Sequence, residues 1–117
     1  MLDDSGVVFE PVFEGPVDAL GEDARTTVYR ICQAAVREAV RLEMVRRFGL
    51  RLEVVPDENG GHVVGLAMDL EFSAYTQHLP TLQVVPAIKD RVLAVHGSYL
   101  LEPLVHGHRH SVRFVAP

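Results

Sequence analysis

The stretch of residues 25–48 constrains the fold most, because it is the one run long and periodic enough for a sizeable helix. Thr26 or Thr27 is placed to cap its start, and Gly49 stands where a helix commonly ends in a left-handed residue. A helix of this length depends on packing for its stability, so the rest of the chain is expected to supply the surface beneath it. Its apolar side chains recur at steps of three and four residues, the period of a helix with one face on a core: Val28, Ile31, Cys32, Ala35, Val36, Ala39, Val40 and Leu42.

The composition indicates one globular domain spanning residues 1–117, with residues 1–5 as a frayed terminus. Hydrophobic residues make up 48% of the chain and charged residues 23%, which is an ordinary globular mixture. The net charge is −5, and the 11 basic residues are mixed among 16 acidic ones. Nucleic acid is therefore not expected as a partner, because phosphate binding needs a basic footprint.

Two further features predict a soluble cytoplasmic domain. The single cysteine, Cys32, cannot form an internal disulfide, and its place on the apolar side of the helix fits a buried thiol in a reducing compartment. No apolar run approaches the ~20 residues that span a bilayer, and the N-terminus lacks the basic-then-apolar pattern of a signal peptide. We therefore expect no membrane insertion.

The segments before and after the long helix have the patterns of strands. Residues 7–13 are apolar and extended, and Pro11 places them at a sheet edge or a bulge because proline lacks a ladder donor. Residues 50–55 alternate with a period of two. Residues 56–61 contain an asparagine-glycine pair, which predicts a hairpin turn, and residues 63–72 return as the second strand.

The C-terminal part predicts a second helix and a second hairpin. Pro86 suits the first position of a helix, where its missing amide costs nothing, and Gly97 suits its end. The hairpin is expected as a strand at residues 99–105, a turn at residues 106–108 and a last strand at residues 112–115.

Residues 73–85 show no clear period, and we expect a loop or a short irregular helix there. The order is then strand, long helix, hairpin, loop, helix and hairpin. This order predicts an α+β fold, a two-layer sandwich with both helices on one face of a mixed sheet of about five strands.

Two local strings resemble a known family. Residues 27–35 read TVYRICQAA and residues 90–100 read DRVLAVHGSYL. They are similar to the first catalytic helix and to the last helix with its following glycine in the C-terminal ATP-binding domain of sensor histidine kinases. Within this GHKL (Bergerat-type) family, the nitrate-sensor-like subfamily is the most similar, and the resemblance covers residues 7–115. It implies the same two-layer fold, with ATP and Mg²⁺ as the cofactors of an intact member.

The resemblance also assigns the magnesium position, and the chain departs from the family there. In the family, the first helix carries a glutamate that polarises water and, four residues on, an asparagine that binds Mg²⁺. The matching residues are Ala34 and Glu38. Alanine offers no base. Glu38 either supplies an oxygen ligand to a divalent cation or forms a salt bridge with Arg41 on a solvent-facing helical face.

The adenine position departs from the family pattern as well. The family places an aspartate before glycines at the second and fourth positions, because glycine lets the backbone approach the nucleotide. The closest match is Asp69, with Glu71 and Ser73 in place of the two glycines, and the glycines of the lid are missing between residues 73 and 85. Residues 57–61 contain an aspartate and two glycines, but they follow the wrong strand and are interpreted as the hairpin turn. We therefore expect the fold to be kept and the nucleotide site to be lost.

A histidine kinase also needs a phosphoacceptor helix, in which a histidine is typically followed by an acidic residue. None of the six histidines here is followed by Asp or Glu. If Met1 is the native start, no phosphoacceptor domain accompanies this one. If it is not, that domain lies upstream.

The first interpretation is a degenerate histidine-kinase ATPase-like domain without enzymatic activity or cofactor. It would act as a protein-interaction and regulatory module in two-component signalling. Its expected partner is a sensor kinase, a response regulator or its own copy in a homodimer.

Two alternatives remain open. In one, the chain is a functional ATP-binding domain of a histidine kinase, with Glu38 holding Mg²⁺ and Asp69 holding adenine. In the other, His106, His108 and His110 form a metal site, because alternate residues of an extended segment share one face. In the competing interpretation, these histidines belong to a polar hairpin turn and to the residues on either side of it, and bind no metal.

Overall fold

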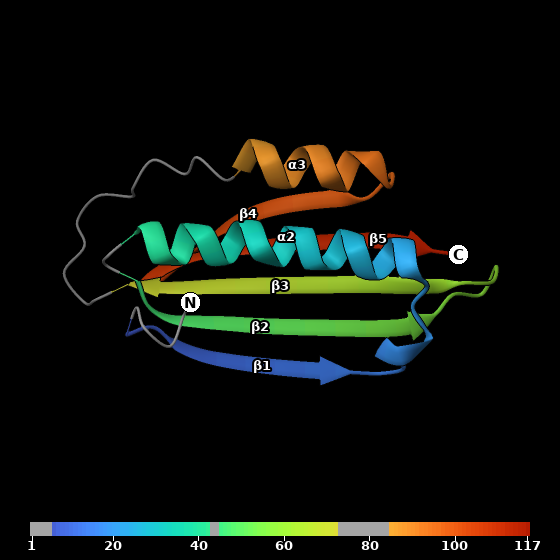
Figure 1. Ribbon diagram of the computed structural model, residues 1–117, viewed down its shortest axis with the longest axis horizontal. Coiled ribbons are helices and arrows are strands. Elements are labelled where there is room, and N and C mark those ends of the chain that lie inside the picture. The colour runs from blue at the N-terminus through green and yellow to red at the C-terminus, as the bar shows by residue number, and fades with distance from the viewer. Residues whose placement is uncertain (1–5, 43–44, 73–84) are drawn as a thin grey trace.

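The computed structural model describes residues 6–42, 45–72 and 85–117. Within them the chain forms a five-stranded sheet in the order β1-β2-β3-β5-β4, together with two α-helices and a short 3-10 helix (Figure 1). β1 runs parallel to β2 and the other neighbours are antiparallel, so the predicted mixed sheet and α+β fold are confirmed. The elements are β1 (Val8–Glu14), η1 (Val17–Ala19), α2 (Glu22–Arg41), β2 (Val45–Pro56), β3 (His62–Phe72), α3 (Val85–Ala94), β4 (Ser98–Leu104) and β5 (Gly107–Ala116).

Both α-helices lie side by side over one face of the sheet, which we call the covered face; the other is the open face (Figure 1). β3 shows the difference, because Val64, Leu66, Met68 and Leu70 are buried while the residues that alternate with them are at least partly exposed. α2 packs on the covered face through buried Ile31 and Ala35. The small alanine lets the helix backbone approach the sheet closely. The predicted arrangement, with both helices on one face, is confirmed.

The start of the long helix differs from the prediction. α2 begins at Glu22, and its N-cap is Gly21 without a side-chain cap. Thr26 and Thr27 therefore lie inside the helix, where the Thr27 hydroxyl donates to the Asp23 carbonyl oxygen at 3.0 Å. The capping role predicted for them is wrong. Two acidic residues in the first turn, which interact favourably with the helix dipole, support the earlier start.

The end of this helix was also predicted wrongly. α2 stops at Arg41, and Val45 and Phe48 belong to β2, where both are buried on the covered face. A β-bulge between Val45 and Arg47 gives these two apolar residues a spacing of three. That spacing imitates a helical period in the sequence. Gly49 is consequently a residue of β2, paired with Asp69, and does not end the helix.

The edge strand and the first hairpin agree with the prediction. β1 contains Pro11 and lies at the edge of the sheet, next to β2 alone. β2 and β3 pair in antiparallel register from Pro56 and His62 at the hairpin end. The turn between them holds Gly60 and Gly61 at φ values of 92° and 76°, a left-handed conformation that side chains disfavour.

The second helix ends differently from the prediction. The described part of α3 spans Val85–Ala94, and the left-handed residue after the helix is His96 (φ 56°) and not Gly97. The Gly97 amide donates to the Val92 carbonyl oxygen at 2.9 Å. Glycine is required at this position by packing, because a Cβ atom would meet the Arg113 carbonyl oxygen at 2.6 Å.

The second hairpin turns earlier than expected. β4 ends at Leu104 and β5 starts at Gly107, so His108 lies in a strand and not in the turn. The prediction for residues 73–85 falls on residues outside the described part of the chain, apart from Val85. None of the helices in the described residues has the length and apolar character needed to cross a membrane.

Candidate functional site

Glu38 lies on α2 one turn before its C-terminus, and its side chain points into the covered face of the sheet. The residue is only 2% exposed. The expectation that it occupies a solvent-facing helical face beside Arg41 is therefore wrong. The reason is its spacing: Glu38 follows Ala35 by three residues and precedes Leu42 by four, so it falls within the apolar stripe.

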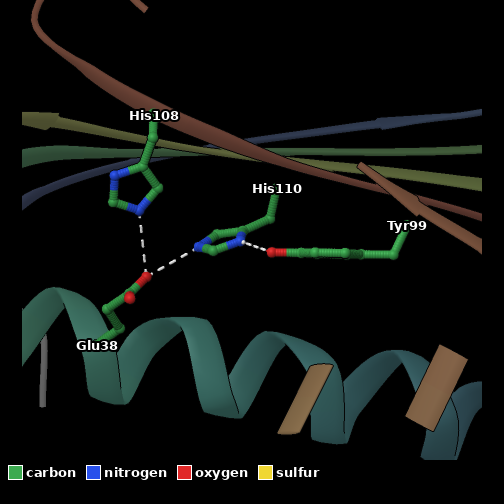
Figure 2. A network of polar contacts seen from close by, with 4 residues as sticks. All are labelled: Glu38, Tyr99, His108 and His110. Carbon is green, nitrogen blue, oxygen red and sulfur yellow. Dashed lines mark hydrogen bonds and ion pairs between the residues drawn. The ribbon is translucent and has the colours of Figure 1, made fainter. Parts of the chain in front are cut away.

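His108 and His110 on β5 face this carboxylate (Figure 2). They alternate along the strand and share the covered face, with 2% and 0% exposure. Their Nε2 atoms lie 3.3 and 2.8 Å from the same oxygen, Oε2 of Glu38. His106, the third histidine of the predicted metal triad, lies in the exposed turn before β5. The structure thus brings two of the three histidines together and adds a glutamate from a distant helix.

Tyr99 on β4 extends the network, with its hydroxyl 2.6 Å from Nδ1 of His110 (Figure 2). In the neutral form of His110, the tyrosine hydroxyl donates to Nδ1 and the Nε2–H donates to Glu38. The two rings stack with centroids 5.9 Å apart. The His108 ring is held edge-on between His110 at 5.0 Å and Phe72 at 5.3 Å. Packing therefore fixes the orientation of both imidazoles.

The electrostatics keep Glu38 ionised and Tyr99 protonated at neutral pH. Burial raises the pKa of the Glu38 carboxyl, but the hydrogen bonds and charges of His108 and His110 outweigh burial, so the net pKa lies below the ordinary value. Burial, and secondarily the charge of Glu38, raises the pKa of Tyr99 to about 12. Among the described residues, Oε1 of Glu38 and Nδ1 of His108 are buried without a hydrogen-bond partner. The site is therefore a buried negative charge with unused lone pairs.

Asp69 lies on the open face, because it alternates along β3 with buried Met68 and Leu70. Its carboxylate accepts two hydrogen bonds from Arg109, from Nε to Oδ1 at 2.6 Å and from Nη2 to Oδ2 at 2.8 Å. Glu38 and Asp69, which the sequence placed together in one nucleotide site, are thus on opposite sides of the sheet.

Two further positions of the predicted pocket, Ala34 and Glu71, have ordinary surroundings. Ala34 is partly buried and packs against the core. Glu71 is exposed on the open face, where its carboxylate lies 3.5 Å from Nε of Arg47. Ser73 lies outside the described residues.

The comparisons with known proteins identify the fold. No protein-family model matches the chain, and no curated protein matches it. Solved structures of histidine kinases do match. The blue-light activated histidine kinase of Erythrobacter litoralis EL346 has a TM-score of 0.67 at 6% identity, covering 98% of this chain and 38% of that one. The Acinetobacter baumannii histidine kinase AdeS has a TM-score of 0.64 at 10% identity, covering 98% and 57%. Full-length ShkA, solved in complex with AMPPNP, has a TM-score of 0.63 at 14% identity, covering 98% and 27%.

These similarities establish a histidine-kinase ATPase-like fold, as the resemblance of the two strings predicted. At identities of 6–14% they concern the fold alone. The chain also spans less than two thirds of each of these three structures, between 27% and 57% of their length.

The sequence predicted Glu38 as one candidate ligand and His108 with His110 as part of another site, but it did not predict their contact, and it missed Tyr99. Two signals were present. Glu38 interrupts an apolar helical stripe, and the two histidines continue the alternation of buried Val112 and Phe114 along β5. Both signals assign the side chains to the buried side of their own elements.

Proposed function

We propose that this chain is a degenerate histidine-kinase ATPase-like module of the nitrate-sensor-like subfamily. In this proposal it holds no nucleotide, transfers no phosphoryl group and acts by contacting a protein partner in two-component signalling. The observation that carries the proposal is the separation of Glu38 and Asp69. These residues are the remaining candidates for magnesium and adenine, yet they lie on opposite faces of the sheet, and each is bonded to groups of the chain itself.

The bonds of Glu38 argue against a role in binding nucleotide-bound Mg²⁺. Its side chain is fully buried and accepts from two imidazoles, so rotation toward a solvent-borne ligand would break both contacts. Each hydrogen bond to a charged group contributes about 1.5–3 kcal/mol. Magnesium also keeps most of its ligands as water and phosphate oxygens, which a site closed by two imidazole rings does not favour.

The bonds of Asp69 argue similarly against adenine recognition. Both of its oxygens accept from the Arg109 guanidinium, a bidentate arrangement that is among the stronger side-chain pairs. The exocyclic amino group of adenine would have to replace one of these charged donors with a neutral one.

The partner is proposed from the fold. The solved structures reported above are histidine kinases, so a sensor kinase or a response regulator in the cytoplasm is the proposed class of partner. A second copy of this chain is the other candidate.

Calorimetric titration of the folded domain with ATP, with and without Mg²⁺ and up to millimolar nucleotide, tests the loss of the nucleotide site. We expect no saturable heat, whereas a catalytically intact histidine-kinase domain run in parallel should give a single-site curve. A saturable signal that disappears in Glu38→Ala and Asp69→Ala would instead support the functional ATP-binding alternative.

Multi-angle light scattering tests the partner. Run on the chain alone over rising concentration, it detects a homodimer. Run with a purified sensor kinase or receiver domain, it detects a mixed complex. If the chain alone has the mass of a monomer, and each mixture shows only the masses of the separate proteins, the interaction role is contradicted for the partners tried.

A further inference from the structure

The cluster of Glu38, His108 and His110 has the composition of a transition-metal site. One atom of each residue can serve as a ligand, and these three atoms all lie within 4.8 Å of one another. All three residues are buried. The two histidines come from one strand and the glutamate from a helix, so an ion held by them would join α2 to β5.

The two distances from Glu38 Oε2 to the imidazole nitrogens are close to those of tetrahedral zinc. Zinc bonds to nitrogen and carboxylate oxygen are about 2.0–2.2 Å, which places neighbouring ligands about 3.3–3.6 Å apart in a tetrahedron. Glu38 Oε2 is already 3.3 Å from Nε2 of His108. Its 2.8 Å separation from Nε2 of His110 would have to widen by only about half an ångström to admit the ion.

The surroundings of His110 resemble those of a metal ligand. Ligating histidines commonly bond their second ring nitrogen to an outer group that sets the tautomer and the ring orientation. Tyr99 contacts Nδ1 of His110 at 2.6 Å and leaves Nε2 directed at the cluster. With an ion on Nε2, the proton moves to Nδ1, and the tyrosine oxygen accepts from it.

The hydrogen bonding of Glu38 also favours a bound ion. Oε1 is buried and has no hydrogen-bond partner within the described part of the chain, while Oε2 accepts from both imidazoles. Buried carboxylates are normally paired with a cation or bound to a metal. A divalent ion would supply the positive charge directly, whereas the imidazoles supply it only when protonated.

From these observations we propose that Glu38, His108 and His110 bind one Zn²⁺ ion that fastens α2 to β5. Two imidazoles and one carboxylate are a known zinc ligand set with a fourth position left for water, while Mg²⁺ and Ca²⁺ prefer oxygen ligands alone. The site is independent of the proposed loss of nucleotide binding, because none of the arguments for it involves ATP.

The test uses the full chain without any polyhistidine tag, after removal of metal by a chelator. Zn²⁺ affinity is measured by competition with a chromophoric chelator, and Co²⁺ is added as a spectroscopic probe of coordination. We expect one ion per chain and the intense visible absorption of tetrahedral Co²⁺. Glu38→Gln should weaken zinc binding by more than roughly 100-fold, the upper range for loss of an outer-shell partner.

Two further variants separate the buried site from adventitious binding. His106→Ala removes the exposed histidine of the same hairpin and should leave affinity and spectrum unchanged. Tyr99→Phe removes the positioning hydroxyl and should weaken binding roughly 10-fold without changing the stoichiometry. If Glu38→Gln does not fold, as judged by circular dichroism, Tyr99→Phe and the wild-type cobalt spectrum carry the test.

Three results would overturn the proposal. These are no zinc binding by the folded wild-type chain, an octahedral cobalt spectrum, or zinc affinity that falls in His106→Ala and is unaffected by Tyr99→Phe.

Discussion

Glu38→Ala is the substitution expected to destabilise this domain most among changes to its charged residues. It deletes the acceptor of two buried imidazoles. His108 is then left with neither ring nitrogen bonded to a described residue, since Nδ1 already lacks a partner among residues 6–42, 45–72 and 85–117. His110 keeps its contact with Tyr99.

The magnitude follows from the groups left unpaired. Each buried polar group without a partner costs about 1–3 kcal/mol. Loss of the 2.8 Å hydrogen bond to His110 should cost an amount in the middle of that range, and loss of the 3.3 Å contact with His108 an amount at its lower end. Loss of a buried methylene adds about 0.8 kcal/mol. We expect a total near 4 kcal/mol, a large share of the roughly 5–15 kcal/mol that stabilises a domain.

Relief from burying a charge does not cancel this loss. The pKa of Glu38 in the folded chain lies below its ordinary value although burial by itself would raise it. The contacts of the ionised carboxylate therefore outweigh the cost of burying its charge, so folding stabilises the ionised form relative to the protonated form.

Urea unfolding followed by circular dichroism, at neutral pH with a chelator present, measures the effect. Glu38→Leu serves as the volume control, because it fills the space but leaves both imidazoles unpaired; it should still lose about 3 kcal/mol. Glu10→Ala serves as the surface control. Glu10 pairs with Arg47 at 3.0 Å with its side chain 52% exposed, so its loss should cost less than about 1 kcal/mol.

The reasoning is refuted if Glu38→Leu is as stable as wild type, because hydrogen bonding to the histidines would then contribute nothing measurable. It is equally refuted if Glu38→Ala and Glu10→Ala lose the same amount.

Three further predictions concern pH, backbone packing and the open face. Because the pKa of Glu38 is lowered on folding, its stabilisation is present above the unfolded value and is lost as pH falls through the folded one; the stability difference between wild type and Glu38→Gln should therefore shrink below roughly pH 4 in urea titrations at stepped pH. Gly107→Ala would place a Cβ atom against a backbone carbonyl oxygen of β3, so we expect a loss of more than about 2 kcal/mol by the same assay, and an unchanged midpoint would be evidence against this packing. Asp69→Ala breaks a partly exposed pair with Arg109 and should cost about 1 kcal/mol or less; a loss as large as that of Glu38→Ala would contradict the placement of Asp69 on the open face.

Much of the architecture was readable from local patterns. The edge position of β1 followed from Pro11, the first hairpin from its asparagine-glycine turn, and the order of elements from the alternation of helical and strand periods. The end of α2 was not readable. The bulge in β2 gives Val45 and Phe48 the spacing of a helix, and a local period does not distinguish the two causes.

The candidate site shows the same limit more clearly. The sequence contains a signal for the side of its own element that each of these residues occupies, although Glu38 was predicted on the solvent-facing side. Glu38 falls in the apolar stripe of α2, and His108 and His110 follow the buried alternation of β5. The sequence also determined that Asp69, one residue out of phase with Met68, faces away from the core.

Only the tertiary structure decided that these residues meet. Glu38 and His110 are 72 residues apart, and their contact depends on β5 pairing between β3 and β4 beneath the C-terminal half of α2. Periodicity reports the buried face of an element because it reflects contact with the core as a whole. It does not report which strand lies under which turn of a helix, since the order of strands is set by long-range pairing and packing. The strand order brings Glu38, which interrupts the apolar stripe of α2, into contact with His108 and His110 of β5, and the three residues form one buried cluster.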